Sequence, residues 1–260
     1  MAESQAAAGG HAGGAGENPM SAPEEFYVGY LAKAPPRLAR FTRRVVAATA
    51  SAVLVAGVGL AIALPYFGAG DFEFGQTREF VRTLRCGSAP RLLAADADDL
   101  IVGAGKHGVP SEICGASGGE VTLRGTLIQR EGRQAIEVES VAARGASGKV
   151  APAAQALGRV TLTGEIVDSK CYFGVMNPGE GRLHRACAEL CLRGGVPAVF
   201  VARDRTGAAA YLIITGADGE PINAALLRWV GEAVEATGEV VREGRWLAWR
   251  IDPATLRRAE

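Results

Sequence analysis

The longest hydrophobic run of the chain extends from Val45 to Phe67 and contains no charged residue. As an α-helix it would be about 34 Å long, enough to cross a bilayer core of roughly 30 Å. A buried core helix normally keeps a polar face, whereas Thr49 and Ser51 are the only small polar residues here. A cleaved signal peptide would need an unusually long charged region before the run. We therefore predict an uncleaved transmembrane helix over residues 45–67.

Beyond this run, short stretches of alternating apolar and polar residues indicate β-strands. The clearest lie within 120–140, where Glu131-Gly132 supplies a turn, and within Val160–Val167. Two further strand pairs, over 196–216 and 235–252, flank a helical pattern at Pro221–Val230. Five short strands with a helix between them fit a small Greek-key barrel such as the OB-fold.

The predicted fold is an N-terminal transmembrane α-helix followed by mainly β structure, as tandem small OB-like barrels with short helices. The first β domain, a degenerate OB-like unit, is expected over 71–141 and the second over 159–256. Residues 142–158 are rich in Ala, Gly and Ser and are the expected linker.

Internal similarity supports two related units. Residues 123–133 resemble 236–245 with a one-residue shift, and Val-Thr-Leu-x-Gly occurs at both 121–125 and 160–164. Glycine in a strand permits the sharp bends that small twisted barrels need.

The N-terminal flank predicts how the chain is oriented in the membrane. Residues 1–24 have the composition of a disordered tail, and 25–44 form a juxtamembrane segment that mixes aromatic and basic residues. Its basic residues are Lys33, Arg37, Arg40, Arg43 and Arg44, whereas the other flank begins with Asp71 and Glu73. The positive-inside rule places the N-terminus in the cytoplasm and residues 68–260 in the periplasm, for a single-pass protein of the inner membrane.

Charge narrows the range of partners. The chain has 28 basic and 28 acidic residues, so its formal net charge is zero and gives no electrostatic case for nucleic acid. The expected partner is the lipid bilayer. The aromatic and basic segment over 25–44 is also a possible docking site for membrane protein partners.

Candidate chemistry is concentrated between Gly164 and Pro197. Cys171 follows a predicted strand, and His184, Cys187 and Cys191 follow at i, i+3 and i+7 of a helical pattern that ends at Gly194-Gly195. Together they form a Cys₃His set that suits Zn²⁺ or an iron centre. Asp168 and Met176 are further candidate ligands, and a thioether beside thiolates favours Cu(I).

A disulfide is the structural alternative to a metal. A bridge would join Cys171 to Cys187 or Cys191 and leave one thiol beside His184, which could be redox-active. Cys86 and Cys114 of the first unit are expected to pair with each other. The stripe on the helix could also be buried packing, because free cysteine packs as a small hydrophobe.

The motif D-x-x-C-Y, followed by H-x-x-C-A-x-x-C-x-x-G-G-x-P, occupies residues 168–197. It resembles a group of small exported bacterial OB-like domains of unknown function, over about a third of the chain. The resemblance implies an exported barrel with a Cys/His cluster at its rim. It implies no named reaction.

The function predicted from these features is that of an anchored periplasmic accessory subunit of a membrane electron-transfer or assembly system, with a metal or redox site. The alternatives are a structural adaptor whose cysteines are stapled and a thiol-based redox enzyme. A glycine-rich stretch, GAGKHG at 103–108, lacks the spacing and final Ser/Thr of a P-loop and predicts no nucleotide site.

Overall fold

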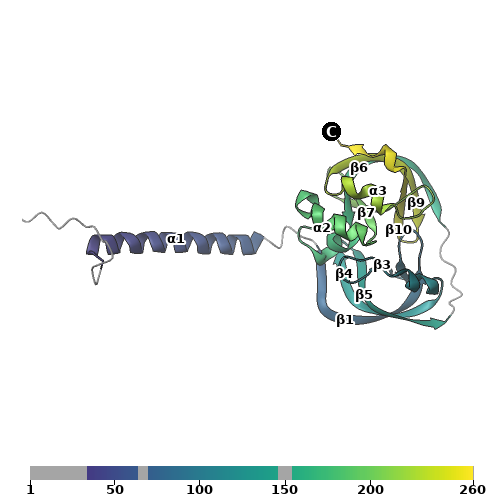
Figure 1. The fold of residues 1–260 in the computed structure, drawn as a ribbon, viewed down its shortest axis with the longest axis horizontal. Helices are drawn as coiled ribbons and strands as arrows, with labels where there is room; N and C mark the ends of the chain where they lie inside the picture. Colours follow the sequence, from purple (N-terminus) through teal and green to yellow (C-terminus); the bar gives the residue numbers. More distant parts are fainter. Residues whose placement is uncertain (1–33, 64–69, 146–153, 260) are drawn as a thin grey trace, which may run out of the picture. The chain divides into compact units, whose positions relative to one another are not determined.

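The computed structural model describes residues 34–63, 70–145 and 154–259 (Figure 1). Its first element is α1 (Pro36–Ala63), which among the described residues is the one helix long and apolar enough to cross a membrane. The predicted apolar helix is confirmed over 45–63. Residues 36–44 of the predicted juxtamembrane segment are also helical and continue into the apolar run, because no residue breaks the helix after Pro36. The predicted tail, residues 25–33 and residues 64–67 lie outside the described part.

Residues 70–145 and 154–259 form a compact unit. Its first half is a closed barrel in the order β1-β2-β3-β5-β4, with β4 returning to pair with β1. Only β3 and β5 run parallel within this barrel. The strands are β1 (Gly70–Arg85), β2 (Arg91–Leu93), β3 (Asp98–Val102), β4 (Glu120–Arg130) and β5 (Arg133–Gly145), with a 3₁₀ turn η2 (Ser111–Ala116) between β3 and β4.

The second half repeats this topology in the order β6-β7-β8-β10-β9, and β9 returns to β6. Again the third and fifth strands are parallel. The tandem OB-like barrels predicted from the alternating pattern are confirmed. The strands are β6 (Gln155–Asp168), β7 (Ala198–Arg203), β8 (Ala209–Thr215), β9 (Ala233–Glu243) and β10 (Trp246–Ile251), with a short edge strand β11 (Arg257–Arg258) on β9.

Helical segments lie between the strands of the second barrel. A π-turn η3 (Cys171–Val175) and α2 (Gly181–Arg193) connect β6 to β7, and α3 (Asn223–Leu226) with η4 (Leu227–Trp229) connects β8 to β9. A 3₁₀ turn η5 (Pro253–Thr255) precedes β11. The helix predicted over 221–230 is therefore shorter and ends as a 3₁₀ turn, because Val230 enters an extended bridge with Ile166.

The predicted domain boundaries are wrong at the linker. Residues 142–145 belong to β5, which pairs with β4 to Gly145, and residues 155–158 belong to β6, which pairs with β9 from Gln155. The strands extend beyond the alternating apolar and polar residues used to predict them, because the backbone hydrogen bonds that pair strands do not require apolar side chains. Residues 70–145 and 154–259 also pack as one compact unit rather than as two independent domains.

Three glycines let the strands bend closely over their neighbours. A Cβ on Gly125, Gly164 or Gly238 would lie 2.2–2.5 Å from a carbonyl oxygen of the adjacent strand. Gly125 and Gly238 occupy equivalent strands, β4 and β9, whereas Gly164 lies in β6. The Val-Thr-Leu-x-Gly repeat therefore marks the same bend in non-equivalent strands.

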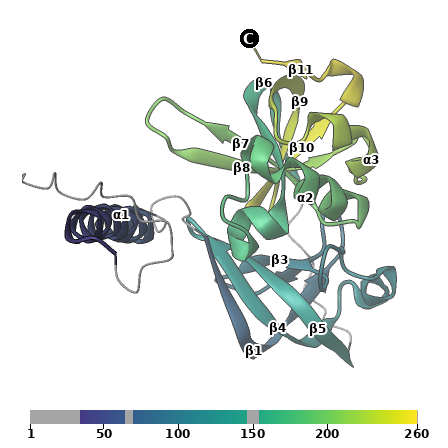
Figure 2. The same ribbon diagram turned by 60° about the vertical axis from the view of Figure 1, so that its left-hand side comes forward.

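Three hydrophobic cores hold the unit together. One lies inside the first barrel around Leu84, Ile101 and Leu123, and one inside the second around Phe200 and Trp249. The third joins both barrels: Leu100, Val102, Ile128 and Ala135 of the first pack with Tyr172, Phe173, Tyr211 and Trp246 of the second. This shared core explains why the barrels, seen one beside the other in Figures 1 and 2, form a single unit.

The repeated sequence Arg-Glu-Gly-Arg forms a hairpin tip in each barrel, and each tip contacts the other barrel. At the first tip, Arg130 lies over the Tyr172 ring at 4.0 Å and donates to the Tyr172 carbonyl, and Arg133 donates to the Arg245 carbonyl. At the second tip, the Arg245 amide donates to Asp98. The internal similarity thus identifies the docking elements between the barrels.

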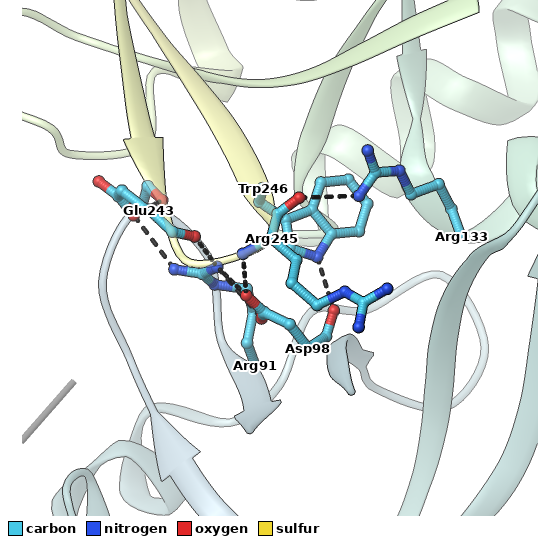
Figure 3. A network of polar contacts seen from close by, with 7 residues as sticks. Arg91, Asp98, Arg133, Glu243, Arg245 and Trp246 are labelled. Atoms are coloured by element: carbon cyan, nitrogen blue, oxygen red, sulfur yellow. Dashed lines mark hydrogen bonds and ion pairs between the residues drawn. The ribbon is translucent and has the colours of Figure 1, made fainter. Parts of the chain in front are cut away.

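A buried ionic network closes this interface (Figure 3). Arg91 of β2 has no exposed side-chain surface and donates to both carboxylate oxygens of Asp98, at 3.1 and 3.0 Å. It also donates to the carbonyl and the carboxylate of Glu243 in the second barrel, at 2.7 and 3.2 Å. Trp246 donates from Nε1 to the Asp98 carbonyl at 2.7 Å. One guanidinium therefore neutralises two buried carboxylates from different barrels.

Replacing Arg91 tests this network. Arg91→Met should lower the free energy of unfolding by about 3–5 kcal/mol, because it leaves two buried carboxylates without their cation. Urea unfolding of the full chain in detergent measures the change. Arg124→Met, at an exposed position of β4, is the matched control and should change stability by less than about 0.5 kcal/mol. Equal losses in the two variants would contradict the assigned role of Arg91.

Candidate metal centre

Helix α2 places the cysteines and ends in a well-defined cap. Arg, Leu, Ala and Glu dominate it and are all good helix formers. At its C-terminus Val196 N–H donates to the Cys191 carbonyl and Gly195 N–H to the Leu192 carbonyl, with Gly195 at φ +90°. These two bonds are those of a Schellman motif, which needs glycine at the left-handed position. The predicted stop at Gly194-Gly195 is confirmed, so the register of α2 is fixed.

The buried face of α2 carries His184, Ala188, Cys191 and Leu192, and Cys187 lies half-buried at its edge. Cys171 comes from the other side, at the start of η3 and directly after β6. Asp168, the last residue of β6, accepts a hydrogen bond from Cys171 N–H at 2.8 Å and fixes the start of the turn. A strand end and a helix face thereby bring the cysteines together, as the spacing predicted.

The three sulfur atoms form a compact cluster. Cys171 Sγ lies 3.9 Å from Cys187 Sγ and 3.9 Å from Cys191 Sγ, and all three lie within 4.8 Å of one another. All three are free thiols, and Cys171 and Cys191 are buried. The disulfide staple considered for Cys171 is therefore absent from the structure. The predicted Cys86–Cys114 disulfide is confirmed in the first barrel.

The thiols of the cluster are not equivalent. The hydrogen bond between Cys171 and Cys191, together with burial, raises the pKa of Cys171. The same hydrogen bond lowers the pKa of Cys191. Of the two buried thiols, Cys191 is therefore the one whose thiolate is favoured relative to an ordinary cysteine, and a thiolate is the form that binds metals and acts as a nucleophile.

His184 lies next to the cluster and is held by Asp168. Its Nε2 donates to Asp168 Oδ2 at 2.9 Å, and both side chains are almost completely buried. Asp168, Cys171 and His184 form a second group whose ligand atoms lie within 4.8 Å of one another. Cys171 is thus common to both groups. A carboxylate that holds one ring nitrogen orients the imidazole, as is typical of metal-bound histidines. The structure does not bring the predicted Cys₃His set together as one group, since His184 shares its group with Cys171 but not with Cys187 and Cys191.

The two further candidate ligands, Asp168 and Met176, differ in burial. Asp168 is at the centre of the second group, as a partner of His184 and of the Cys171 backbone. Met176 is exposed, unlike the buried Cys171 and Cys191. A residue that the sequence did not single out is Lys106 of the first barrel, whose Nζ donates to Cys187 Sγ at 2.6 Å. This hydrogen bond raises the pKa of Lys106.

The sulfur spacing fits a single metal ion. At a Zn–S distance of about 2.3 Å, two ligands of a tetrahedral site lie about 3.8 Å apart. The observed 3.9 Å separations match that edge. A cluster in which each thiolate binds a different iron would need the sulfurs further apart. The donor set therefore suits one soft or borderline ion.

Counting thiols tests this arrangement. The denatured, unreduced chain should show three reactive thiols, from Cys171, Cys187 and Cys191, and the reduced chain should show five. The difference comes from Cys86 and Cys114, which do not react while they are bridged. Titration with a chromogenic thiol reagent measures both numbers. One reactive thiol before reduction would mean that Cys171 is stapled after all.

Comparisons with known proteins add no assignment to this site. No family model, curated protein or solved structure matches the chain. The resemblance to exported bacterial domains, which covers about a third of the chain and is most specific at residues 164–197, therefore stays a prediction. Function has to be inferred from the residues of the site.

Proposed function

We propose that this chain is a single-pass inner-membrane protein whose second barrel binds one Zn²⁺, iron or copper ion in the periplasm. The ligands are Cys171, Cys187 and Cys191, with His184 as the fourth. The observation that supports this best is the pair of 3.9 Å sulfur separations around Cys171, which match the edge of a tetrahedral metal–thiolate site.

The surroundings of the cysteines support a metal rather than simple packing. His184 and Asp168 make a buried carboxylate–imidazole pair directly beside Cys171. Such a pair orients the ring and raises the basicity of the free nitrogen, which improves it as a ligand. A purely structural core would gain more from apolar residues at these positions, since buried polar groups are costly to desolvate.

The membrane part of the proposal comes from α1 and from the charges of the sequence. α1 is long and apolar enough to span a bilayer. Basic residues before it and acidic residues after it favour a cytoplasmic N-terminus. In that orientation the barrels reach the periplasm, where the Cys86–Cys114 disulfide is stable. We propose an accessory role in a membrane electron-transfer or assembly system, with the bilayer and membrane proteins as partners.

Thiol redox chemistry is the second candidate. The lowered pKa of Cys191, caused by the hydrogen bond from Cys171, favours the nucleophilic thiolate. In exchange with the disulfide of a partner, Cys171 and Cys191 would form a disulfide while the partner's disulfide is reduced to two thiols, so that two electrons and the protons of the two cysteines pass to the partner. An adaptor without chemistry is the third candidate, and it predicts neither metal nor reversible thiol oxidation.

Metal analysis separates these functions. The full chain purified in detergent under reducing conditions should hold about one metal ion. Cys187→Ser should abolish stoichiometric binding because it removes one of three thiolates. His184→Ala should weaken Zn²⁺ binding about 10–100-fold. Competition with a chromophoric zinc chelator measures the affinities.

The control for the cysteine substitution lies on the same helix. Ala186→Ser introduces a hydroxyl at an exposed neighbouring position and should leave Zn²⁺ affinity unchanged. A metal-free wild-type chain with a reversible Cys171–Cys191 disulfide would refute the metal proposal in favour of redox chemistry. A metal-free chain without reversible oxidation would favour the adaptor.

A further inference from the structure

The glycine-rich stretch Gly103–Gly108 follows β3 of the first barrel and docks on the C-terminal end of α2 in the second. Gly108 N–H donates to the Gly194 carbonyl at 2.8 Å. A Cβ on Gly108 would lie 2.2 Å from the Gly195 oxygen, and a Cβ on Gly194 would lie 1.9 Å from the Lys106 oxygen. The backbones can approach this closely only because side chains are missing on both sides.

Lys170 of the second barrel binds the same loop through hydrogen bonds to its backbone carbonyls. Its Nζ donates to the carbonyls of Gly103 and Gly105, at 2.7 and 2.6 Å, and pairs with Glu137 of β5 at 2.9 Å. The side chain is 2 % exposed. Because Lys170 immediately precedes Cys171, the residue next to a candidate ligand fixes the loop of the other barrel. The loop is thus tied to both segments that supply the cysteines.

The outcome of this docking is the position of Lys106. Its ammonium lies 2.6 Å from Cys187 Sγ, at the half-buried edge of the cluster, while Cys171 and Cys191 are buried behind it. Lys106 itself is exposed and has no other hydrogen bond or ion pair within the described part of the chain. The docked position of the loop therefore places the Lys106 ammonium against the Cys187 sulfur.

The positive charge of Lys106 would compensate the negative charge of a metal–thiolate centre. Three thiolates around a divalent ion carry a net charge of −1, and the neutral imidazole of His184 adds none. A partly buried anion is stabilised by a cation within a few ångströms. Lys106 supplies one positive charge at the open side of the cluster, where the ion and its thiolates would otherwise face solvent without a counter-charge.

We infer that the metal site is shared between the barrels: Lys106 of the first barrel belongs to it and stabilises the negative charge of the metal–thiolate centre. This inference rests on the metal-binding function proposed above. Lys106 acts as a positioning and charge-compensating residue and not as a ligand, because its ammonium has no lone pair. The glycines of the loop and the Schellman cap of α2 are the means by which it is placed.

A charge series at position 106 tests the inference, with Zn²⁺ as the probe and the full chain in detergent. Lys106→Arg should keep the wild-type affinity. Lys106→Met should weaken it about fivefold, the effect of losing one partly exposed ion pair. Lys106→Glu should weaken it about 25-fold, because the change in charge is doubled. The differences should shrink at high salt, which screens exposed charges. A purely structural role would not follow charge or ionic strength.

A second variant moves Lys106 without replacing it. Gly194→Ala places a Cβ against the Lys106 carbonyl and should weaken Zn²⁺ binding by an amount similar to Lys106→Met. Combining the two should cause no further loss, since both remove the same interaction. Gly115→Ala, where an added Cβ meets nothing within 4 Å, is the control. Thermal unfolding of the metal-free variants shows whether each still folds.

The outcomes distinguish the inference from the proposed function. If wild-type chain and all Lys106 variants bind Zn²⁺ equally, the site binds metal and Lys106 is not part of it. If Lys106→Arg binds as weakly as Lys106→Met, charge is not what Lys106 contributes. A wild-type chain that binds neither Zn²⁺ nor an iron or copper ion overturns both the function and the inference.

Discussion

The arrangement of the two barrels depends on the ion pairs that the Arg91 guanidinium makes with carboxylates of both barrels. The guanidinium is fully buried and bonded at once to Asp98 of its own barrel and to Glu243 of the other. Buried ion pairs contribute little net stability compared with apolar packing, but they tolerate few alternative geometries. The shared hydrophobic core supplies the driving force for docking, and Arg91 favours the docked orientation in which the carboxylates of Asp98 and Glu243 both reach its guanidinium.

This orientation decides what the site contains. The segment from Lys170 to Phe173 runs through the interface: Lys170 holds the loop of the first barrel, Cys171 faces α2, and Tyr172 and Phe173 enter the shared core. A small rotation of one barrel against the other would separate Lys106 from Cys187 while leaving each barrel intact. The Lys106–Cys187 contact therefore depends on how the two barrels are docked.

Local patterns in the sequence predicted much of this structure. The apolar run of α1, the strand alternation and the spacing of His184, Cys187 and Cys191 depend on neighbours in the chain, and each was confirmed as an element or a face. Lys106 could not be assigned in this way, because 81 residues separate it from Cys187 and the contact exists only after the barrels dock. Its one signal was the unexplained glycine content of 103–108. The linker was predicted too long because residues 142–145 and 155–158 pair through their backbones without an alternation of apolar and polar side chains that would reveal a strand.

The π-turn η3 places Cys171 directly before two aromatic residues of the shared core, Tyr172 and Phe173. An ion that binds only the folded turn adds to folding free energy as its concentration exceeds its dissociation constant. Through η3 that added free energy would act on the seam between the barrels as well as on the second barrel itself. If an ion binds there, its occupancy and the stability of the interface between the barrels would be thermodynamically linked. The first barrel, which contributes to neither candidate ligand group among the described residues, would then also respond to the metal concentration.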